Sequence, residues 1–359
     1  MNEVERKPKS VLVTGATDGL GKALALLLAG RGYRVFAAGR SPEKLAQLDA
    51  AALENKFALE TIALDVCSDT SVQSAVDAVL AKAGALDVLV NNAGVNYTAA
   101  VEDLSMDDWR AQFETNFFGV LRVTRALLFN MRNRRSGRIL MMSSLSGLVT
   151  PPTQGAYSSS KHALEGLSNA LRMELYPFGI DVILIEPGYI ITGIQKAAAE
   201  LSKPYVQKGG PYAPLYARFF TSVNETRSKS RTTPQDCARV MLHAIETPRP
   251  KPRYGVTSLA PFVKWSKRLL TDRSRRESRV RNLKRQTVFS QLFPLLAPGL
   301  VQRAFRIIRG GLRAGKFDRK HSVKIADLVA FRLQPDIFDP RNFRRQGLDP
   351  RQRLLFVIL

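Results

Sequence analysis

The sequence predicts an α/β fold in which helices cover both faces of a doubly wound parallel sheet. Three observations support this prediction. Short runs rich in β-branched residues alternate with longer helical patterns through the first 256 of the 359 residues. The runs are apolar at almost every position, which is typical of strands buried on both faces. A glycine-rich turn also joins the first run directly to the first helical pattern.

Seven apolar runs are interpreted as strands. They cover residues 11–13, 35–37, 61–64, 88–90, 139–142, 182–185 and 254–256. The helical patterns between them cover residues 20–30, 43–54, 71–82, 106–131 and 157–176. Pro177 and Gly179 end the last of these helices. Right-handed crossovers between such strands would bring ligands to the carboxyl ends of the sheet.

The alternating pattern stops near residue 265. Residues 1–264 are therefore predicted to form one domain, and residues 265–359 a basic C-terminal extension of unassigned fold. Residues 264–320 hold 17 Lys or Arg and only 3 Asp or Glu, so most of the formal net charge of +23 lies there. A charge of this density attracts polyanions.

Within the basic segment, apolar residues recur at helical spacing from Val301 to Leu312, and arginines lie off that stripe. Three interpretations stay open: a loosely ordered solvated tail, a helix on an anionic membrane surface, and a nucleic-acid contact, which is the least favoured. The first residues are too polar for a signal peptide, and no run approaches the ~18 apolar residues of a membrane span. We therefore expect a cytoplasmic protein, with peripheral membrane attachment as the open alternative.

Cysteines and histidines are few and scattered. Cys67 and Cys237 form no CxxC pair, which argues against a disulfide framework or a thiolate metal site and suits a reducing compartment. His162, His243 and His321 are isolated from one another. No metal site is predicted.

The glycine-rich turn has the chemistry of a phosphate-binding loop. It runs from Gly15 through Thr17, Asp18, Gly19 and Leu20 to Gly21, with the spacing GxxxGxG, and then opens a helix. Backbone N–H groups and the helix dipole can meet a pyrophosphate there. Gly15 suits a tight turn, whereas Gly19 and Gly21 allow close approach of backbone.

Two further motifs accompany the loop: Asn-Asn-Ala-Gly at residues 91–94 and Tyr-Ser-Ser-Ser-Lys at residues 157–161. Together the three motifs resemble those of the short-chain dehydrogenase/reductase family, over roughly residues 8–262. The resemblance implies a Rossmann-like fold, a nicotinamide dinucleotide cofactor and a homo-oligomer, either a dimer or a tetramer. The basic extension lies outside the resemblance.

The resemblance also assigns cofactor contacts outside the glycine loop. It implies that Asp65 contacts the adenine amino group, with Val66 beside it in backbone contact. The turn containing Asn92, Ala93 and Gly94 would border the cofactor. The segment with Pro187, Gly188 and Thr192 would grip the nicotinamide carboxamide. Asp65 could instead be a solvated strand end, and Thr192 merely a helix cap.

The end of the second strand favours NADP(H) over NAD(H). A fold that selects NAD usually places a carboxylate there for the ribose hydroxyls, but this strand ends in Gly39-Arg40-Ser41. The Arg40 guanidinium could bind a 2′-phosphate bidentately. Asp18 argues the other way, because many NADP-preferring relatives carry a basic residue at its position.

Tyr157 and Lys161 lie four residues apart in a helical pattern, so both side chains share one helix face. A nearby ammonium and a nicotinamide cation would favour the tyrosine phenolate. We assign Tyr157 as the general acid or base, beside the cofactor, and Lys161 as the residue that lowers its pKa and holds the nicotinamide ribose. The resemblance implies that Ser144 rather than Ser143 bonds the reacting oxygen and that Asn116 holds a water of the proton relay.

A substrate lid is expected near residues 193–230, where large apolar side chains gather. They are Tyr205, Tyr212, Leu215, Tyr216, Phe219 and Phe220. With Leu145, Val149 and Ile190 they could line a pocket for a hydrophobic substrate, or they could simply pack the lid onto its own domain. The sequence resembles family members that act on steroids, retinoids and acylated ketones.

The sequence thus predicts an NADP-dependent enzyme that interconverts an alcohol and a ketone or aldehyde. The alternative is a dinucleotide-binding scaffold or sensor that acts through its basic tail. The intact set of Asn116, Ser144, Tyr157 and Lys161 favours the enzyme, because a scaffold has no use for proton transfer.

Overall fold

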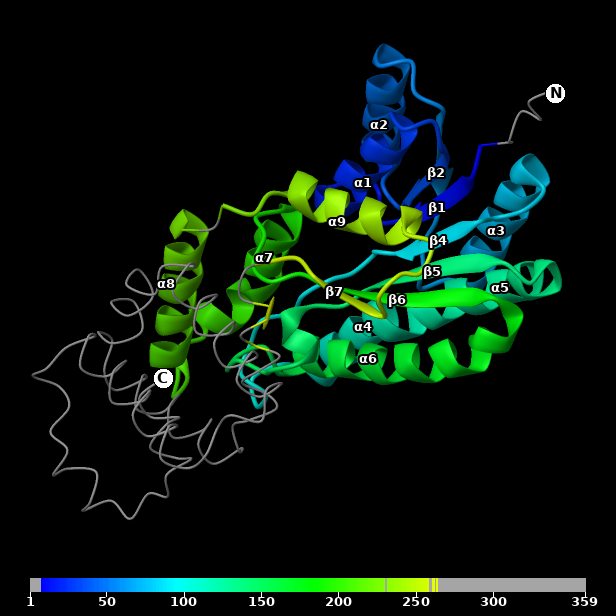
Figure 1. The fold of residues 1–359 in the computed structure, drawn as a ribbon. Coiled ribbons are helices and arrows are strands. Elements are labelled where there is room, and N and C mark those ends of the chain that lie inside the picture. Colours follow the sequence, from blue (N-terminus) through cyan, green and yellow to red (C-terminus); the bar gives the residue numbers. More distant parts are fainter. Residues whose placement is uncertain (1–7, 230, 258–259, 262, 264–359) are drawn as a thin grey trace, which may run out of the picture. The chain divides into compact units, whose positions relative to one another are not determined.

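The computed structural model describes residues 8–229, 231–257, 260, 261 and 263. Its centre is a seven-stranded parallel sheet with the order β3-β2-β1-β4-β5-β6-β7 (Figure 1). The strands are β1 (Ser10–Thr14), β2 (Arg34–Gly39), β3 (Leu59–Ala63), β4 (Val88–Asn91), β5 (Gly137–Met142), β6 (Ile180–Glu186) and β7 (Arg253–Gly255). The predicted doubly wound sheet is confirmed, with its switch point between β1 and β4.

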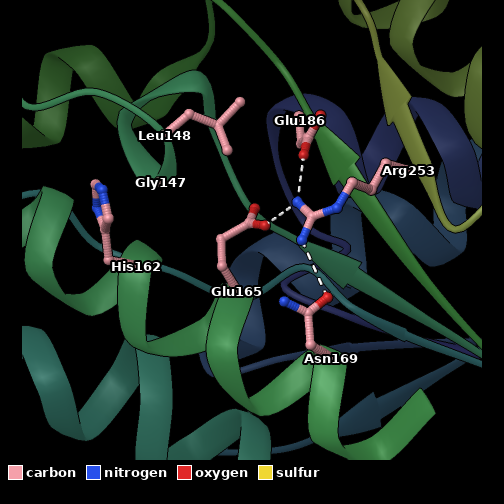
Figure 2. A pocket seen from close by; sticks show the side chains of 7 residues that line it. All are labelled: Gly147, Leu148, His162, Glu165, Asn169, Glu186 and Arg253. Atoms are coloured by element: carbon pink, nitrogen blue, oxygen red, sulfur yellow. Dashed lines mark hydrogen bonds and ion pairs between the residues drawn. The ribbon is translucent and has the colours of Figure 1, made fainter. Parts of the chain in front are cut away.

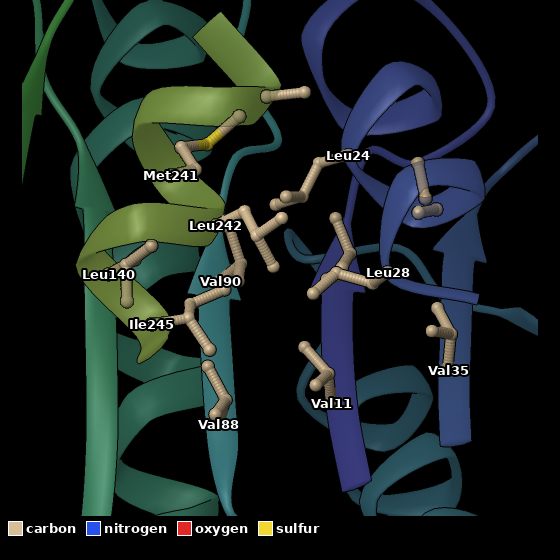
Figure 3. Close-up of a cluster of buried hydrophobic side chains, with 14 of the residues drawn as sticks. Val11, Leu24, Leu28, Val35, Val88, Val90, Leu140, Met241, Leu242 and Ile245 are labelled. Carbon is tan, nitrogen blue, oxygen red and sulfur yellow. The ribbon is translucent and has the colours of Figure 1, made fainter. Parts of the chain in front are cut away.

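Two apolar layers enclose the sheet, because alternate residues of each strand face opposite sides. On one side Val11 and Val13 pack under α1 (Gly19–Ala29) and α9 (Pro234–Glu246), as Figure 3 shows for Val11. On the other side Leu12 faces α3 (Asp69–Ala83), α5 (Gly119–Arg134) and α6 (Gly155–Leu175). Helix α2 (Pro42–Glu54) adds Leu48 to the first layer. Both strand faces are thus buried, which explains the near-continuous apolar runs.

The helix predicted for residues 106–131 is not continuous. Helix α4 (Met106–Phe113) and α5 are joined by a π-helical turn, Glu114–Phe118, which contains Asn116. A π turn inserts one extra residue into the helix and changes the direction of the side chains within it. Gly119 follows directly and packs so closely on Val66 that an added Cβ would lie 2.7 Å from a Val66 methyl group. The apolar spacing of the segment gave no sign of this interruption.

The region expected to form the lid contains two helices, α7 (Gly193–Gln207) and α8 (Ala213–Lys229). Helix α9, absent from the predicted set, follows them and begins with a capping box in which Thr233 and Asp236 bond each other's backbone. The Thr-Pro-Gln-Asp signal for that helix was present in the sequence.

The basic segment, residues 264–320, and the remainder of the C-terminal extension lie outside the described residues, as does the boundary predicted near residue 265. Within the part of the chain that is described, the longest apolar stretches of helix fall short of what is needed to cross a membrane.

Candidate active site

The glycine loop between β1 and α1 has the geometry of a cofactor cradle. Gly15 and Gly19 have φ angles of 63° and 51°, which residues other than glycine rarely adopt. At Gly21 an added Cβ would lie 2.3 Å from the Gly15 carbonyl oxygen. Each of the three glycines is therefore required by the backbone, and the loop presents bare backbone to the carboxyl end of the sheet.

Thr14 and Asn92 fix this loop through hydrogen bonds to main-chain groups. The Thr14 hydroxyl accepts hydrogen bonds from the N–H groups of Asn92 and Ala93, at 3.0 and 3.1 Å. The Asn92 amide donates to the carbonyl oxygens of Thr14 and Gly15, both at 2.9 Å. Asn92 and Ala93, predicted to border the cofactor, therefore also fix the shape of the loop. Thr14 was not among the predicted site residues.

The charges at the end of β2 are arranged in a way that the sequence did not predict. Asp18 caps α1 by accepting the Gly19 N–H at 2.6 Å, and its other oxygen lies 3.5 Å from the Lys44 ammonium. Lys44 lies in the first turn of α2, whose N-cap is Ser41. Arg40 is exposed beside them. Thr17 also lies here, packed against Gly39 at the end of β2.

Asp65 and Val66 lie just beyond the end of β3. The Asp65 carboxylate accepts the Cys67 N–H at 3.0 Å, and the Asp65 N–H donates to Ser71 at 2.9 Å. The Val66 carbonyl accepts from Arg122 at 2.7 Å, and the predicted backbone contact of Val66 with the adenine stays a prediction.

The segment after β6 faces the glycine loop. An added Cβ at Gly19 would lie 2.9 Å from Thr192 Cβ, so Thr192 borders the loop. Thr192 is also the N-cap of α7 and bonds the Gln195 side chain, as the helix-cap interpretation expects, and its contact with the cofactor stays a prediction. Gly188 packs against Thr257 with no room for a side chain, and Pro187 accepts the N–H of Leu145 at 2.9 Å.

Tyr157 and Ser144 meet at the carboxyl end of β5. Burial raises the pKa of Tyr157, and a hydrogen bond with the Ser144 hydroxyl opposes this rise. Ser144 also contacts the Pro187 carbonyl at 3.5 Å and caps the 3₁₀ turn Leu145–Gly147. The neighbouring Ser143 points elsewhere: it is buried and donates to Glu165 at 2.5 Å. The choice of Ser144 over Ser143 therefore agrees with the geometry.

Lys161 lies one turn beyond Tyr157 on α6, with its ammonium nitrogen 5.7 Å from the centre of the Tyr157 ring. The ammonium donates to the Met142 carbonyl at 2.7 Å. Burial lowers the pKa of Lys161 to about 8, although the nearby carboxylate of Glu165 opposes the shift. Lys161 therefore places an ammonium close to Tyr157. Whether that ammonium keeps its proton depends on the balance between burial and the Glu165 charge.

Asn116 is fully buried in the π turn and bonds the backbone of Val95 and the side-chain hydroxyl of Ser160. Its amide nitrogen donates to the Val95 carbonyl at 3.0 Å and to Ser160 at 3.3 Å, while its oxygen accepts the Val95 N–H at 2.9 Å. An added Cβ at Gly94 would lie 3.3 Å from the Asn116 oxygen. The π turn thus ties the motif at residues 91–94 to α6, on which Tyr157 and Lys161 lie.

The aromatic residues of the expected lid mostly pack the lid onto the domain. Tyr205, Tyr212, Tyr216 and Phe220 join a third apolar cluster with Ala99, Ala100, Leu104, Ala156 and Trp109. Tyr216 donates to Asp103 at 2.6 Å and accepts the Ala100 N–H at 2.9 Å. Ile190, expected to line the pocket, is buried in the core. Packing onto the domain, rather than lining a substrate pocket, therefore describes Ile190 and the four aromatic residues of the cluster.

Known proteins share these features. The family model of the short chain dehydrogenases matches residues 9–202. Uncharacterized oxidoreductase YusZ of Bacillus subtilis is 41% identical over 232 residues, 64% of this chain and 82% of its own. Human retinol dehydrogenase 8 is 35% identical over 257 residues, 68% of this chain and 79% of its own.

Two solved structures have the same fold with a cofactor bound. A short-chain dehydrogenase/reductase from Burkholderia phymatum in complex with NAD has a TM-score of 0.64 and 26% identity, and the match covers 74% of this chain and 93% of that one. An actinorhodin polyketide ketoreductase with NADPH has a TM-score of 0.61 and 30% identity, covering 70% and 97%. The chain belongs to the short-chain dehydrogenase family and is an oxidoreductase of alcohols and carbonyl compounds that uses a nicotinamide dinucleotide.

Proposed function

We propose that the protein is an NADP(H)-dependent enzyme that interconverts a hydrophobic alcohol and its ketone or aldehyde, with Tyr157 as the acid and base. The observation that carries the proposal is the cluster of Ser144, Tyr157 and Lys161 at the carboxyl end of β5, opposite the glycine loop. A buried phenol that bonds a serine hydroxyl can move a proton to or from an oxygen held between them.

Each side chain has a distinct task in this proposal. In reduction the Tyr157 phenol donates its proton to the carbonyl oxygen, and in oxidation the phenolate takes the proton of the alcohol. Ser144 bonds the reacting oxygen and orients it. Asn116 fixes the backbone at Val95 and, in this proposal, holds a water of the proton relay beneath Lys161.

The electrostatic requirement follows from the burial of Tyr157. Burial raises its pKa, so the phenolate needs nearby positive charge to form near neutral pH. The Lys161 ammonium supplies one such charge. When bound, the nicotinamide ring exchanges the hydride with the substrate carbon and, in its oxidised form, brings a second positive charge.

The residues present fit such a cofactor. Gly15, Gly19 and Gly21 leave backbone bare where a pyrophosphate would lie, and no Cβ could be added at Gly21 without moving the loop. Asp65 and the Val66 N–H would hold the adenine. Leu20, Gly94, Pro187, Gly188 and Thr192 would border the pyrophosphate and the nicotinamide.

The preference for NADP(H) rests on Arg40 and now also on Lys44. Arg40 is exposed at the end of β2, and among the described residues no carboxylate pairs with it. The Asp18 charge that argued against a phosphate is engaged with the α1 N-terminus and lies 3.5 Å from Lys44. Lys44 thus offsets part of the Asp18 charge, while Arg40 and the N-terminus of α2 stay available to a phosphate.

A hydrophobic substrate and a homo-oligomer complete the proposal. The relative named retinol dehydrogenase 8 supports a hydrophobic alcohol by its name. For self-association, the support is a set of exposed apolar side chains on two neighbouring helices. They are Phe129 on α5, Met173 on α6 and Tyr176 just after α6.

Replacement of Tyr157 by Phe tests the chemistry. The ring stays and only the proton-transfer hydroxyl is lost, so we expect kcat with hydrophobic ketones and NADPH to fall by at least about a hundredfold. NADPH affinity, followed by its fluorescence, should change little. Tyr176→Phe, which alters an exposed tyrosine just beyond the same helix, is the matched control. Undiminished turnover in Tyr157→Phe would refute the assignment.

Replacement of Arg40 by Asp tests the cofactor preference. It removes a phosphate donor and adds an acceptor for ribose hydroxyls. We expect the ratio of kcat/KM for NADPH to that for NADH to fall by about tenfold or more, in line with the loss of one charge-assisted pair. An unchanged ratio would show that Arg40 does not select the cofactor.

A further inference from the structure

A network of charged side chains lies next to the loop that contains Ser143 and Ser144. None of the steps proposed above uses it. Glu165 on α6 is 7% exposed and forms an ion pair with Arg253 of β7. Arg253 also pairs with the fully buried Glu186 of β6 at 2.8 Å and donates to Asn169 at 3.0 Å. These four side chains line a pocket of about 420 Å³. Figure 2 shows Arg253 reaching the two glutamates and Asn169.

Glu165 connects this network to the active site in two ways. Its second oxygen accepts the Ser143 hydroxyl at 2.5 Å, and Ser143 is the neighbour of Ser144. Glu165 also follows Lys161 by one helical turn on α6. Gly147 packs between these groups, since an added Cβ would lie 2.8 Å from the Ser143 oxygen and 3.2 Å from Glu165 Cγ.

Stability alone does not account for such a network. Removing the Glu165 and Glu186 carboxylates from water costs several kcal/mol per ion, and apolar replacements of similar volume are often as stable. A buried charge that touches a catalytic loop is therefore a candidate for a functional role.

The charged groups around Lys161 and its neighbour Glu165 come from several elements. Helix α6 contributes Tyr157 and Glu165, and farther along it Arg172, which interacts electrostatically with Glu165. Strands β6 and β7 contribute Glu186 and Arg253, which pair with each other. Neutral groups approach from the other sides, namely the Met142 carbonyl at the end of β5 and, nearby, Ser143, Ser160 and Asn116. Among the charges of the described chain, Glu165 is the one that raises the pKa of Lys161 against the effect of burial.

We propose that Glu165, fixed by Arg253 and Ser143, is a positioning residue that keeps the ammonium of Lys161 charged and holds the loop bearing Ser144. The proposal rests on the proposed function of Lys161 and Ser144. The Glu165 carboxylate is a negative charge one helical turn from Lys161. It opposes the effect of burial, so that Lys161 keeps its proton in the working pH range.

The test separates the charge of Glu165 from its hydrogen bonds. Glu165→Gln keeps the size and the acceptor for Ser143 but removes the charge, whereas Glu165→Asp keeps the charge. The titration of Lys161 is followed by NMR of protein labelled with ¹³Cε-lysine, with the resonance assigned by its loss in Lys161→Arg. The pH profile of kcat/KM is measured in parallel. Glu60→Gln is the matched control, because Glu60 also bonds two cations, Arg34 and Lys82, but on β3.

In Glu165→Gln the Lys161 midpoint should move to lower pH. Loss of kcat/KM should be about fivefold greater at pH 8.5 than at pH 6.5, as expected for removal of one opposite charge at close range. Glu165→Asp should retain most of the wild-type profile, and Glu60→Gln all of it. An equal loss at both pH values with an unmoved midpoint would overturn the proposal, as would a midpoint in Glu165→Asp as low as in Glu165→Gln.

Two further outcomes are informative. If Glu165→Gln does not fold, Glu165→Asp must still show a small downward shift of the midpoint, because its carboxylate is one methylene farther from Lys161, and no shift would overturn the proposal. If Tyr157→Phe retains full activity, the proposed function fails, yet the NMR titration still decides whether Glu165 controls the charge of Lys161.

Discussion

The two sides of the site are held together by different physical means. The cofactor side is a backbone structure: Thr14 and Asn92 bond main-chain groups of the glycine loop, and Gly21 leaves no space for a side chain. The expected substrate side is held by side chains. Tyr212 and Tyr216, in the segment proposed as the lid, reach Glu102 and Asp103, more than a hundred residues earlier in the chain.

This difference separates what a motif can specify from what it cannot. Backbone cradles need particular residues at fixed spacing, since only glycine fits certain φ angles and close approaches. A helix that packs on the domain through side chains needs only a tyrosine that reaches a carboxylate. Many different spacings along the sequence can provide such a pair. We therefore expect the cofactor side to be intolerant of small changes and the lid to respond in a graded way.

The largest effect is expected from Gly21→Ala. The new methyl group would lie 2.3 Å from the Gly15 carbonyl oxygen and 2.4 Å from the Asn92 amide nitrogen, so the loop must move. Overpacking of this kind costs about 3 kcal/mol, and NADPH affinity should fall with it. Urea unfolding and NADPH fluorescence measure the two effects.

The matched control is Gly166→Ala on the exposed face of α6, where an added Cβ meets nothing within 4 Å. It should stabilise the protein by about 0.5–1 kcal/mol, because alanine is the better helix former. Equal behaviour of the two variants would contradict the view that the cofactor side is built from close backbone contacts.

An intermediate effect is expected from Tyr216→Phe in the lid. The lost hydroxyl leaves the buried Ala100 N–H without its acceptor, which costs about 1–3 kcal/mol. Tyr212→Phe removes an exposed hydrogen bond to Glu102 and should change stability by no more than about 0.5 kcal/mol. Substrate KM should rise in Tyr216→Phe while NADPH affinity stays constant. A parallel loss of NADPH affinity would show that the two sides of the site are not independent.

The smallest effect is expected in the alkaline range. Burial and the hydrogen bond to Asp103 raise the pKa of Tyr216 to about 12, above its ordinary value of 10.0. A group with a raised pKa contributes stability that is complete below its unfolded pKa and is lost as pH rises through the folded pKa. The difference in unfolding free energy between wild type and Tyr216→Phe should therefore shrink between pH 10 and pH 12. A constant difference across that range would argue against a neutral, hydrogen-bonded Tyr216.

Local patterns predicted much of the catalytic domain. The alternation of apolar runs and helical patterns predicted all seven strands, and the spacing of Tyr157 and Lys161 placed both on one helix face. The spacing along the sequence to Tyr157 favours Ser144 over Ser143, and in the structure Ser144 is the serine that bonds the phenol. These features depend on residues close together in sequence, where periodicity and propensity operate directly.

Other features were decided by the tertiary structure. The π turn at Asn116 forms where Gly119 packs on Val66, and the Asp18 carboxylate lies 3.5 Å from the ammonium of Lys44, which belongs to a different helix. The network of Glu165, Arg253 and Glu186 joins three elements, and no spacing rule connects their residues. The sequence by itself thus determined which groups are available for chemistry. Only the packing of distant segments decided which charges lie close enough to act on them, because electrostatic and steric effects depend on distance in space and not on distance along the chain.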